Sequence, residues 1–460
     1  MLTVTNPSSL EPITQIPVDN AESVEQKLTK AAALFGNKSR WLPLHERITL
    51  LKALHQKLEP EVDALAQGIA AEGGKPYRDA KVEAQRALAG IELAIHALAE
   101  SQGDIVPLGM AAASSGLRGQ TRPFPIGPVL AFSAFNHPLN LIVHQIIPAF
   151  AAGCPSLVKP APDTPLSCLR LVSAMHEVGI PEDYVQSIIT DDLAIAGQLV
   201  EDSRIAFFTF IGSAKVGWML RGKLAPGVRC ALEHGGVAPG FVCESADLTA
   251  AAKAFCKGGL YHSGQVCVST QRLYVHDSVF DQFCEQLVPL VEALKTGSAE
   301  EAGTDCGPLI RCAEVDRVEA WVDQAVQEGA KCVTGGKRLA DNYFAPTILV
   351  EPAATSRVST DEIFGPVICL YRFSDLKECI NQSNDSPFAF QAAIFTERRD
   401  EVELFYQHVE AATAIVNNHT SFRDDVMPFA GLKQSGLGVG GIPYTLHDMQ
   451  VQKLLVQPGV

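Results

Sequence analysis

The sequence lacks cysteines at the spacings that disulfide frameworks and metal sites use. Its 12 cysteines are scattered along 460 residues, without a C-x-x-C pair and without a Cys/His cluster of zinc-finger spacing. This pattern argues against a disulfide scaffold and against a structural metal site. We therefore expect a protein without bound metal, located in the reducing cytoplasm.

Long apolar runs and excess basic charge are also missing. No uninterrupted apolar stretch approaches the roughly 20 residues of a membrane helix, and residues 1–17 lack the charged start and apolar core of a signal peptide. The chain has 37 Lys and Arg against 52 Asp and Glu, a net charge of -15. Nucleic acids and anionic membranes are bound by basic faces, so the sequence predicts neither as a partner.

What the sequence does contain is a regular alternation of strand-like apolar runs with helical patterns. Hydrophobic residues make up 47% of the chain, which suffices for large cores, and the length suggests two or three domains. Residues 45–69 and 80–101 have helical periodicity, residues 127–236 alternate strands with helices, and a second alternating series follows. Such alternation predicts an α/β fold with parallel sheets covered by helices on both faces.

Two stretches depart from this pattern. Residues 103–126 are rich in Gly, Pro and Ser and contain only short extended pieces. Near the C-terminus, "QVQKLLV" alternates as an edge strand does. Because exposed strand edges seek partners, we expect an arm that pairs subunits into a homodimer or homotetramer.

The glycine motif "GSAKVG", residues 212–217, is neither G-x-G-x-x-G nor a P-loop, because Trp218 and Met219 stand where the P-loop has Lys and Ser or Thr. It follows an apolar strand and opens a helix, where free backbone N–H groups can hold a phosphate. A plain strand-to-helix turn explains the same letters.

Seven motifs in order resemble those of the aldehyde dehydrogenase superfamily, and the resemblance covers nearly the whole chain. They are "FNHP" (135–138), "VKPAPDTPLS" (158–167), "FTFIGSAKVG" (208–217), "LEHGG" (232–236), "GQVC" (264–267), "DEIFGPV" (361–367) and "MPFAGLKQSG" (427–436). The resemblance implies NAD(P)+-dependent oxidation of an aldehyde to a carboxylic acid through a cysteine thioester. It also implies a Rossmann-like cofactor domain, a second α/β catalytic domain and a β-arm for oligomerisation, with the active site between the two domains.

The resemblance assigns three catalytic residues. Cys267 matches the nucleophile, Glu233 the general base, and Asn136 the oxyanion donor that works with the backbone N–H of Cys267. Without the resemblance, Cys267 reads as one more buried thiol, Glu233 as a loop residue and Asn136 as a turn former. A thiol near its reference pKa is only a few per cent ionised at neutral pH, and His262 is the only cation candidate in the local sequence.

The cofactor assignment, NAD or NADP, also rests on the resemblance. Its expected contacts are Lys159, Gly212, Ser213, Glu362, Phe364 and Phe135. Many NAD-preferring relatives carry a Glu three residues after this lysine, where this chain has Pro162. Without that carboxylate a 2′-phosphate is not repelled, so NADP+ is admitted beside NAD+.

The substrate is a small-molecule aldehyde, and the expected lining of its tunnel mixes apolar and polar side chains: His137, Leu141, His144, Val266, Val268, Arg423 and Phe429. We hypothesise a short polar aldehyde whose carboxylate, phosphate or sulfonate is gripped by Arg423. The alternative is that Arg423 is a surface residue paired with Asp424 and Asp425.

The domain boundaries and two rival functions complete the expectations. Residues 1–102 and 127–235 are predicted to form the NAD(P)-binding domain, residues 236–435 the catalytic domain, and residues 103–126 with 436–460 the oligomerisation arm. One rival is a CoA-acylating semialdehyde dehydrogenase, which Glu233 opposes because a base there favours release by water. The other is a non-catalytic NAD(P)-binding protein, which the presence of all three catalytic residues opposes.

Overall fold

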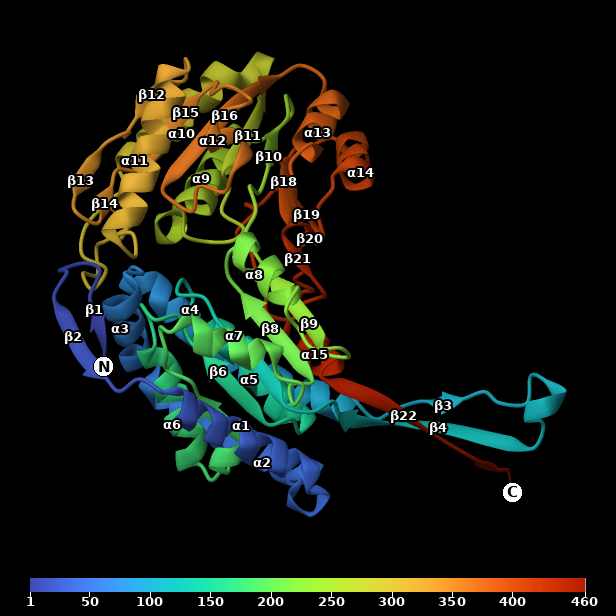
Figure 1. The fold of residues 1–460 in the computed structure, drawn as a ribbon. Helices are drawn as coiled ribbons and strands as arrows, with labels where there is room; N and C mark the ends of the chain where they lie inside the picture. The colour runs from blue at the N-terminus through green and yellow to red at the C-terminus, as the bar shows by residue number, and fades with distance from the viewer. Residues whose placement is uncertain (460) are drawn as a thin grey trace.

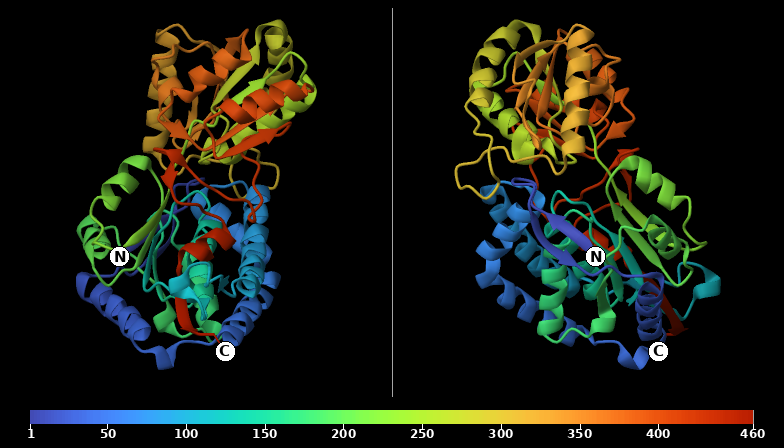
Figure 2. Two further views of the ribbon diagram at one scale, coloured as in Figure 1. Left: turned by 90° about the vertical axis from the view of Figure 1, so that its right-hand side faces the viewer. Right: turned by 60° about the vertical axis from the view of Figure 1, so that its left-hand side comes forward.

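Two lobes and a projecting arm make up the molecule (Figure 1). A computed structural model describes residues 1–459. One lobe is built on a six-stranded sheet, the other on a seven-stranded sheet, and a three-stranded sheet forms the arm. Both views of Figure 2 place the seven-stranded lobe above the six-stranded lobe.

The six-stranded lobe has the strand order β21-β9-β8-β5-β6-β7. Neighbouring strands are parallel, except that β21 runs antiparallel to β9. From β5 the chain proceeds outward through β6 and β7, then returns to place β8 and β9 on the other side of β5. The crevice at the carboxyl ends of β5 and β8 is therefore the point where parallel sheets bind ligands. The strands are β5 Val129–Phe132, β6 Ser156–Lys159, β7 Val185–Ser187, β8 Phe207–Ile211, β9 Arg229–Glu233 and β21 Gly436–Leu437.

Both faces of this sheet are buried, as the alternation of β5 makes clear. Val129 and Ala131 enter the core beneath α2, α3, α4, α5, α6 and α15. Leu130 and Phe132 point to the opposite core, against α1, α7 and α8. Successive side chains of a strand point to opposite faces of the sheet, and here helices cover both faces. Every residue of β5 is therefore apolar, which explains the unbroken apolar run in the sequence. The helices are α1 Ala21–Gly36, α2 Leu44–Leu58, α3 Val62–Gly73, α4 Tyr77–Glu100, α5 Asn140–Ala152, α6 Leu166–Glu177, α7 Leu193–Glu201, α8 Ala214–Arg221 and α15 Ile442–Asp448.

The seven-stranded lobe has the strand order β12-β15-β16-β11-β10-β18-β19, parallel except for the edge strand β12. Helices α9 and α10 cover one face, and α11 to α14 cover the other. The strands are β10 Gly240–Val242, β11 Arg272–His276, β12 Lys331–Thr334, β15 Thr347–Val350, β16 Val367–Phe373, β18 Gln391–Phe395 and β19 Thr413–Val416. The helices are α9 Leu248–Leu260, α10 Phe280–Glu292, α11 Cys312–Gln327, α12 Arg357–Thr360, α13 Leu376–Asn384 and α14 Arg399–His408.

The arm consists of β3 (Ile105–Val106), β4 (Leu117–Pro125) and β22 (Gln450–Pro458), in the order β22-β4-β3. β22 is the edge strand that the alternation of "QVQKLLV" predicts. The expected arm segment 436–460 is divided, however: β21 pairs with β9, and α15 packs against α4 and α5. The arm boundary at 436 is therefore wrong, because β21 and α15 belong to the six-stranded lobe. β21 can pair with β9 because Gly436 has no side chain: a Cβ there would sit 2.4 Å from the Leu232 carbonyl oxygen.

Three small two-stranded sheets, which the sequence patterns did not predict, complete the fold. β1 (Leu2–Thr5) pairs with β2 (Pro12–Ile16), β13 (Arg338–Ala340) with β14 (Tyr343–Phe344), and β17 (Phe388–Ala389) with β20 (Leu432–Lys433). Across residues 1–459, every helix is too short or too polar to cross a membrane.

Candidate active site

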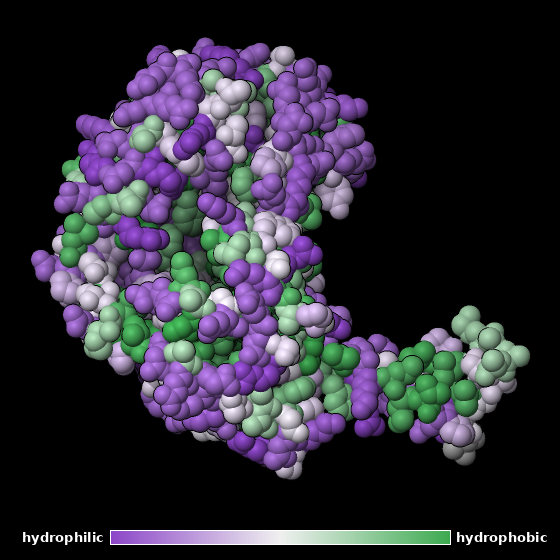
Figure 3. Space-filling view, in the orientation of Figure 1, coloured by the Kyte–Doolittle hydropathy of each residue, from purple (hydrophilic) through white to green (hydrophobic). Residues whose placement is uncertain are grey.

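A cavity of about 1170 Å³ lies between the two lobes. The space-filling view is hollowed at this place (Figure 3). Every residue that the sequence analysis assigns to catalysis, cofactor or substrate lines this one cavity. The structure therefore brings the whole set together, from strand ends and loops of both lobes.

Cys267 lies on a sharply folded loop between α9 and β11. The backbone turns left-handed at His262 (φ 49°), Ser263 (φ 53°) and Gly264 (φ 72°), and a Cβ on Gly264 would sit 2.0 Å from the Gly365 carbonyl oxygen. The Gln265 side chain then fixes the loop by donating to the Pro308 carbonyl (3.2 Å) and accepting from the Ile310 N–H (3.0 Å). Left-handed backbone at residues other than glycine persists only where the surroundings enforce it, so the position of Cys267 is strongly constrained.

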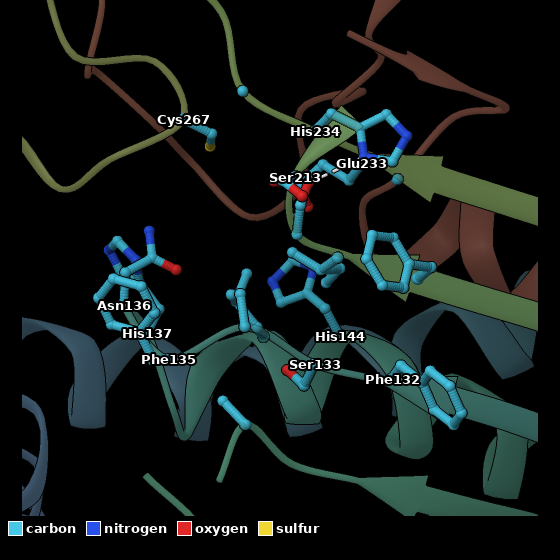
Figure 4. Close-up of a pocket in the computed structure, with 18 of the residues that line it drawn as sticks. Phe132, Ser133, Phe135, Asn136, His137, His144, Ser213, Glu233, His234 and Cys267 are labelled. Atoms are coloured by element: carbon cyan, nitrogen blue, oxygen red, sulfur yellow. Dashed lines mark hydrogen bonds between the residues drawn. The ribbon is translucent and has the colours of Figure 1, made fainter. Parts of the chain in front are cut away.

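Glu233, the last residue of β9, faces the same part of the cavity (Figure 4). Burial raises the pKa of its carboxyl to about 7. Burial, followed by the charge of Glu233, raises the pKa of the Cys267 thiol well above its usual value. At neutral pH the pair therefore holds a protonated thiol beside a carboxyl that is close to its own midpoint, which is suitable for accepting a proton.

The cation near this pair is Arg423, and the expectation that His262 might supply one is wrong. The His262 ring is fully buried, and neither nitrogen has a hydrogen-bond partner within residues 1–459. Burial lowers the pKa of His262 well below its usual value, so the ring is neutral. The positive charge of Arg423 instead lowers the pKa of both Glu233 and Cys267, which partly opposes the effect of burial.

Asn136 follows β5 and is only 4% exposed. Its Nδ2 donates a hydrogen bond to the Gln265 carbonyl (2.8 Å), which ties the loop after β5 to the loop of Cys267. In Figure 4 the amide points toward that loop. An amide nitrogen has two N–H groups, so one of them stays available for an oxygen in the cavity.

The turn after β8 presents free backbone donors to the cavity. Ser213 is the N-cap residue of α8, and its side chain does not cap the helix. The His234 ring holds this turn by a 2.9 Å contact between its Nδ1 and the Gly212 carbonyl oxygen. The same ring covers Gly217, where a Cβ would lie 1.9 Å from it. Gly217 thus has a packing reason, and the first turn of α8 keeps its N–H groups for a ligand.

Glu362 reaches the cavity from the loop before β16. Its Oε1 accepts from the Gly236 N–H (3.2 Å), and a Cβ on Gly235 would overlap its carboxyl group. Burial raises the pKa of Glu362 to about 8. Phe364, with a left-handed backbone (φ 48°), meets Phe135 edge to face with ring centroids 5.8 Å apart.

Polar side chains gather around Asp425 in the wall of the same cavity. Arg86 of α4 donates twice to Asp425, from Nε (2.9 Å) and Nη2 (2.6 Å), and His144 Nε2 lies 2.9 Å from the same carboxylate. Arg423 is not part of this group: it donates to the Met427 carbonyl (2.6 Å) and stacks on Phe429, 4.4 Å from the ring centroid. Within residues 1–459 Arg423 forms an ion pair with neither Asp424 nor Asp425, so the alternative that it is a surface residue paired with them is wrong.

Comparison with known proteins decides the family. A model of the aldehyde dehydrogenase family matches residues 1–455. The chain belongs to the aldehyde dehydrogenase family. It is an NAD(P)-dependent enzyme that oxidises aldehydes to acids, as the motif resemblance implies, and the rival of a non-catalytic binding protein is set aside.

Individual relatives span the aldehyde dehydrogenase chain nearly end to end. A 3-sulfolactaldehyde dehydrogenase of Priestia megaterium is 34% identical over 454 residues, 98% of this chain and 94% of the relative. The structure of aldehyde dehydrogenase 21 from Physcomitrella patens with the reaction product succinate has a TM-score of 0.96 at 32% identity, and covers 100% of this chain and 95% of that one. A glyceraldehyde-3-phosphate dehydrogenase from Methanocaldococcus jannaschii complexed with NADP has a TM-score of 0.95 at 31% identity, covering 100% and 99%.

The six-stranded side of the cavity of this aldehyde dehydrogenase fits NAD(P)+. Ser133 Oγ is buried in the cavity wall without a hydrogen-bond partner within residues 1–459. Lys159 Nζ forms no ion pair in that range and lies 5.8 Å from the ring centroid of Phe132. These donors and the first turn of α8 suit ribose hydroxyls and a pyrophosphate. Pro162 also lines the cavity, beside Lys159.

Several cavity residues escape sequence reasoning. Arg86 and Asp425 meet across 339 residues of sequence, and the only local signal is that Arg86 lies in α4 beside the buried Ala87. Tyr261 lies three residues before the motif "GQVC", and His234 lies within "LEHGG" but had no expected role. Only the fold reveals that their side chains reach the cavity.

Proposed function

We propose that this aldehyde dehydrogenase oxidises a short aldehyde bearing an anionic group, through a thioester on Cys267 that water releases. The observation that carries the proposal is the position of Arg423. Its guanidinium lines the cavity near Cys267 and Glu233, and no ion pair within residues 1–459 uses it. An arginine without an anionic partner in a substrate cavity is suited to bind one.

The proposed chemistry starts from the pair of Cys267 and Glu233. Glu233 accepts the thiol proton, and the Cys267 sulfur forms a bond to the aldehyde carbon. NAD(P)+, when bound, accepts the hydride that this carbon gives up as the thioester forms. Glu233 releases the thiol proton to solvent before hydrolysis begins. The ionised carboxylate then takes a proton from water, whose oxygen attacks the thioester and breaks the carbon–sulfur bond. The acid leaves, and Glu233 returns that proton to the sulfur, which restores the thiol.

Asn136 is the proposed stabiliser of the negative oxygen that forms when sulfur adds to the aldehyde. Replacing Asn136 by alanine is expected to lower kcat by about 10²- to 10³-fold, the usual cost of one oxyanion donor, with a small change in KM. Asn384→Ala is the matched control, because Asn384 Nδ2 also donates to a backbone carbonyl (His408, 2.8 Å) but lies outside the cavity. Equal losses in both variants would contradict the proposed role.

The names of three relatives agree with an anionic substrate. One oxidises 3-sulfolactaldehyde, one holds the product succinate, and one is named for glyceraldehyde 3-phosphate. A sulfonate, a carboxylate and a phosphate all present oxygens that a guanidinium binds in bidentate fashion. Burial lowers the pKa of Arg423 to about 10, which still leaves it charged at neutral pH.

Arg423→Ala tests this proposal with two aldehydes of equal chain length, succinate semialdehyde and butanal, by following reduced nicotinamide with NAD+ and with NADP+. KM for succinate semialdehyde is expected to rise about 10- to 100-fold, the value of a charge-assisted hydrogen bond, while butanal changes less than about 3-fold. Arg372→Ala is the control, since Arg372 also stacks on a phenylalanine, 3.8 Å from the Phe280 centroid, away from the cavity. Equal changes for both aldehydes would refute the anion site.

The arm carries our proposal for assembly. Its exposed apolar side chains include Ile105, which is 86% exposed, and Leu454, Leu455 and Val456 of β22. Figure 3 shows apolar residues gathered on the arm. A long, apolar edge strand is rarely left open to solvent, so we infer a homodimer or homotetramer in which the arm pairs with another subunit. The division into a cofactor domain and a catalytic domain is proposed with the cavity between them.

A further inference from the structure

We infer that His137 and Tyr261 form a specificity site for a hydroxyl group on the carbon next to the aldehyde. The inference rests on the proposed function, because it concerns the same aldehyde site. Both side chains line the cavity, one from each of the two loops that Asn136 joins. His137 directly follows Asn136, and Tyr261 begins the turn that leads to Cys267. The pair therefore faces the substrate atoms adjacent to the reacting carbon.

The two side chains are in contact but retain hydrogen-bonding capacity. Tyr261 Oη lies 3.4 Å from His137 Nε2, and this is the only hydrogen bond of the His137 ring within residues 1–459. The distance is above the 2.7–3.2 Å typical of hydrogen bonds between nitrogen and oxygen. A substrate hydroxyl can both donate and accept a hydrogen bond. It can therefore bond to Tyr261 Oη and His137 Nε2 at once, whereas these two atoms bond only weakly to each other.

The charge state of the pair suits a neutral group. Burial lowers the pKa of His137 well below its usual value and raises that of Tyr261, so both remain uncharged through the neutral range. Lys75, whose Nζ lies 5.9 Å from the Tyr261 ring centroid, is already paired with Glu83. An anion or an ammonium group would therefore lose its hydration here without gaining an unpaired opposite charge. A neutral hydroxyl is the remaining polar ligand, and an apolar carbon would leave both groups unpaired.

A buried ion pair holds the two side chains in place. Lys75 binds Glu83, and both side chains are fully buried. Glu83 Oε1 also accepts from the N–H groups of Leu139 (3.0 Å) and Asn140 (3.1 Å), at the start of α5 and just after His137. Lys75 contacts the Tyr261 ring, and Glu83 binds the backbone just after His137. This ion pair therefore makes the site rigid, which favours discrimination between similar ligands.

The test compares lactaldehyde with propanal, which have three carbons, no charge and only the hydroxyl as a difference. For the wild-type enzyme, kcat/KM is expected to be at least about 10-fold higher with lactaldehyde, since an unpaired buried polar group is costly. In Tyr261→Phe and in His137→Phe, kcat/KM is expected to fall much more for lactaldehyde than for propanal, so that the ratio drops below about 3. The double variant should lose no more than either single one, because the two residues act as one site.

Tyr371→Phe is the matched control. It also removes a buried hydroxyl in hydrogen-bond contact, 2.7 Å from Ser359 Oγ, but it lies outside the cavity, and the ratio should stay at the wild-type value. A wild-type ratio near one, an unchanged ratio in Tyr261→Phe, or an equal loss with both aldehydes would overturn the inference. Failure of the proposed function is a different result, namely equal effects of Arg423→Ala on succinate semialdehyde and butanal.

Discussion

Replacing Cys267 by alanine is expected to abolish aldehyde oxidation, with a loss of kcat/KM of at least about 10⁴-fold. The proposed mechanism contains no other nucleophile, and the cavity places the Cys267 thiol beside the Glu233 carboxyl. Cofactor binding should be retained, because the donors of β5, β6 and α8 are untouched. The measurement is the absorbance of reduced nicotinamide, alongside the Kd of NADP+ by calorimetry.

Cys230→Ala is the control for this variant. Cys230 is also a half-buried free thiol with a pKa raised by burial, and it lies on the strand that ends at Glu233. It does not line the cavity. Full activity in Cys230→Ala together with none in Cys267→Ala is the expected pattern, and substantial activity in Cys267→Ala would remove the basis of the mechanism.

Replacing Glu233 by glutamine is expected to lower kcat/KM by about 10²- to 10⁴-fold at pH 8, the usual contribution of a general base. The carboxyl must be ionised to accept the thiol proton, and its pKa is about 7. In the wild-type enzyme, kcat/KM should therefore rise with pH through about 7. Because glutamine does not titrate there, this limb should be absent from the pH profile of Glu233→Gln.

Glu72→Gln separates the role of Glu233 from a general effect of buried carboxyls. Burial raises the pKa of Glu72 to about 7 as well, but Glu72 lies outside the cavity and accepts hydrogen bonds at the start of α6. Its variant should keep the acid limb of the pH profile. If both variants lost the limb, or if Glu233→Gln kept it, Glu233 would not be the base.

The fold was predictable from the sequence where local patterns decide it. A doubly covered parallel strand must be apolar on both faces, so β5, with its alternating burial into two cores, is visible as an apolar run. The arm boundary was not predictable in this way. The pairing of β21 with β9 depends on the close approach of Gly436 to Leu232, which is a contact between distant segments.

The part of the candidate site that lies within the sequence motifs was predictable. Cys267, Glu233 and Asn136 belong to local patterns, and the fold brings them to one cavity. The absence of an ion pair at Arg423 was not predictable from its neighbours in sequence. The nearby Asp425 pairs with Arg86 of α4, which is distant in sequence. The raised pKa values of Glu233 and Cys267 arise from burial between the two lobes. The residues that bury them are distant in sequence, so a short stretch of sequence could not predict these shifts.

The central claim is that the acyl group of the substrate is carried on Cys267. The direct measurement is mass spectrometry of Glu233→Gln, quenched with acid after mixing with succinate semialdehyde and NADP+, since slow release by water should let the thioester accumulate. The account predicts a mass increase of one acyl group, located on the peptide that contains Cys267 and absent in the Cys267→Ala variant. Reduced nicotinamide formed with no acyl group on the protein, or with the acyl group on another residue, would contradict it.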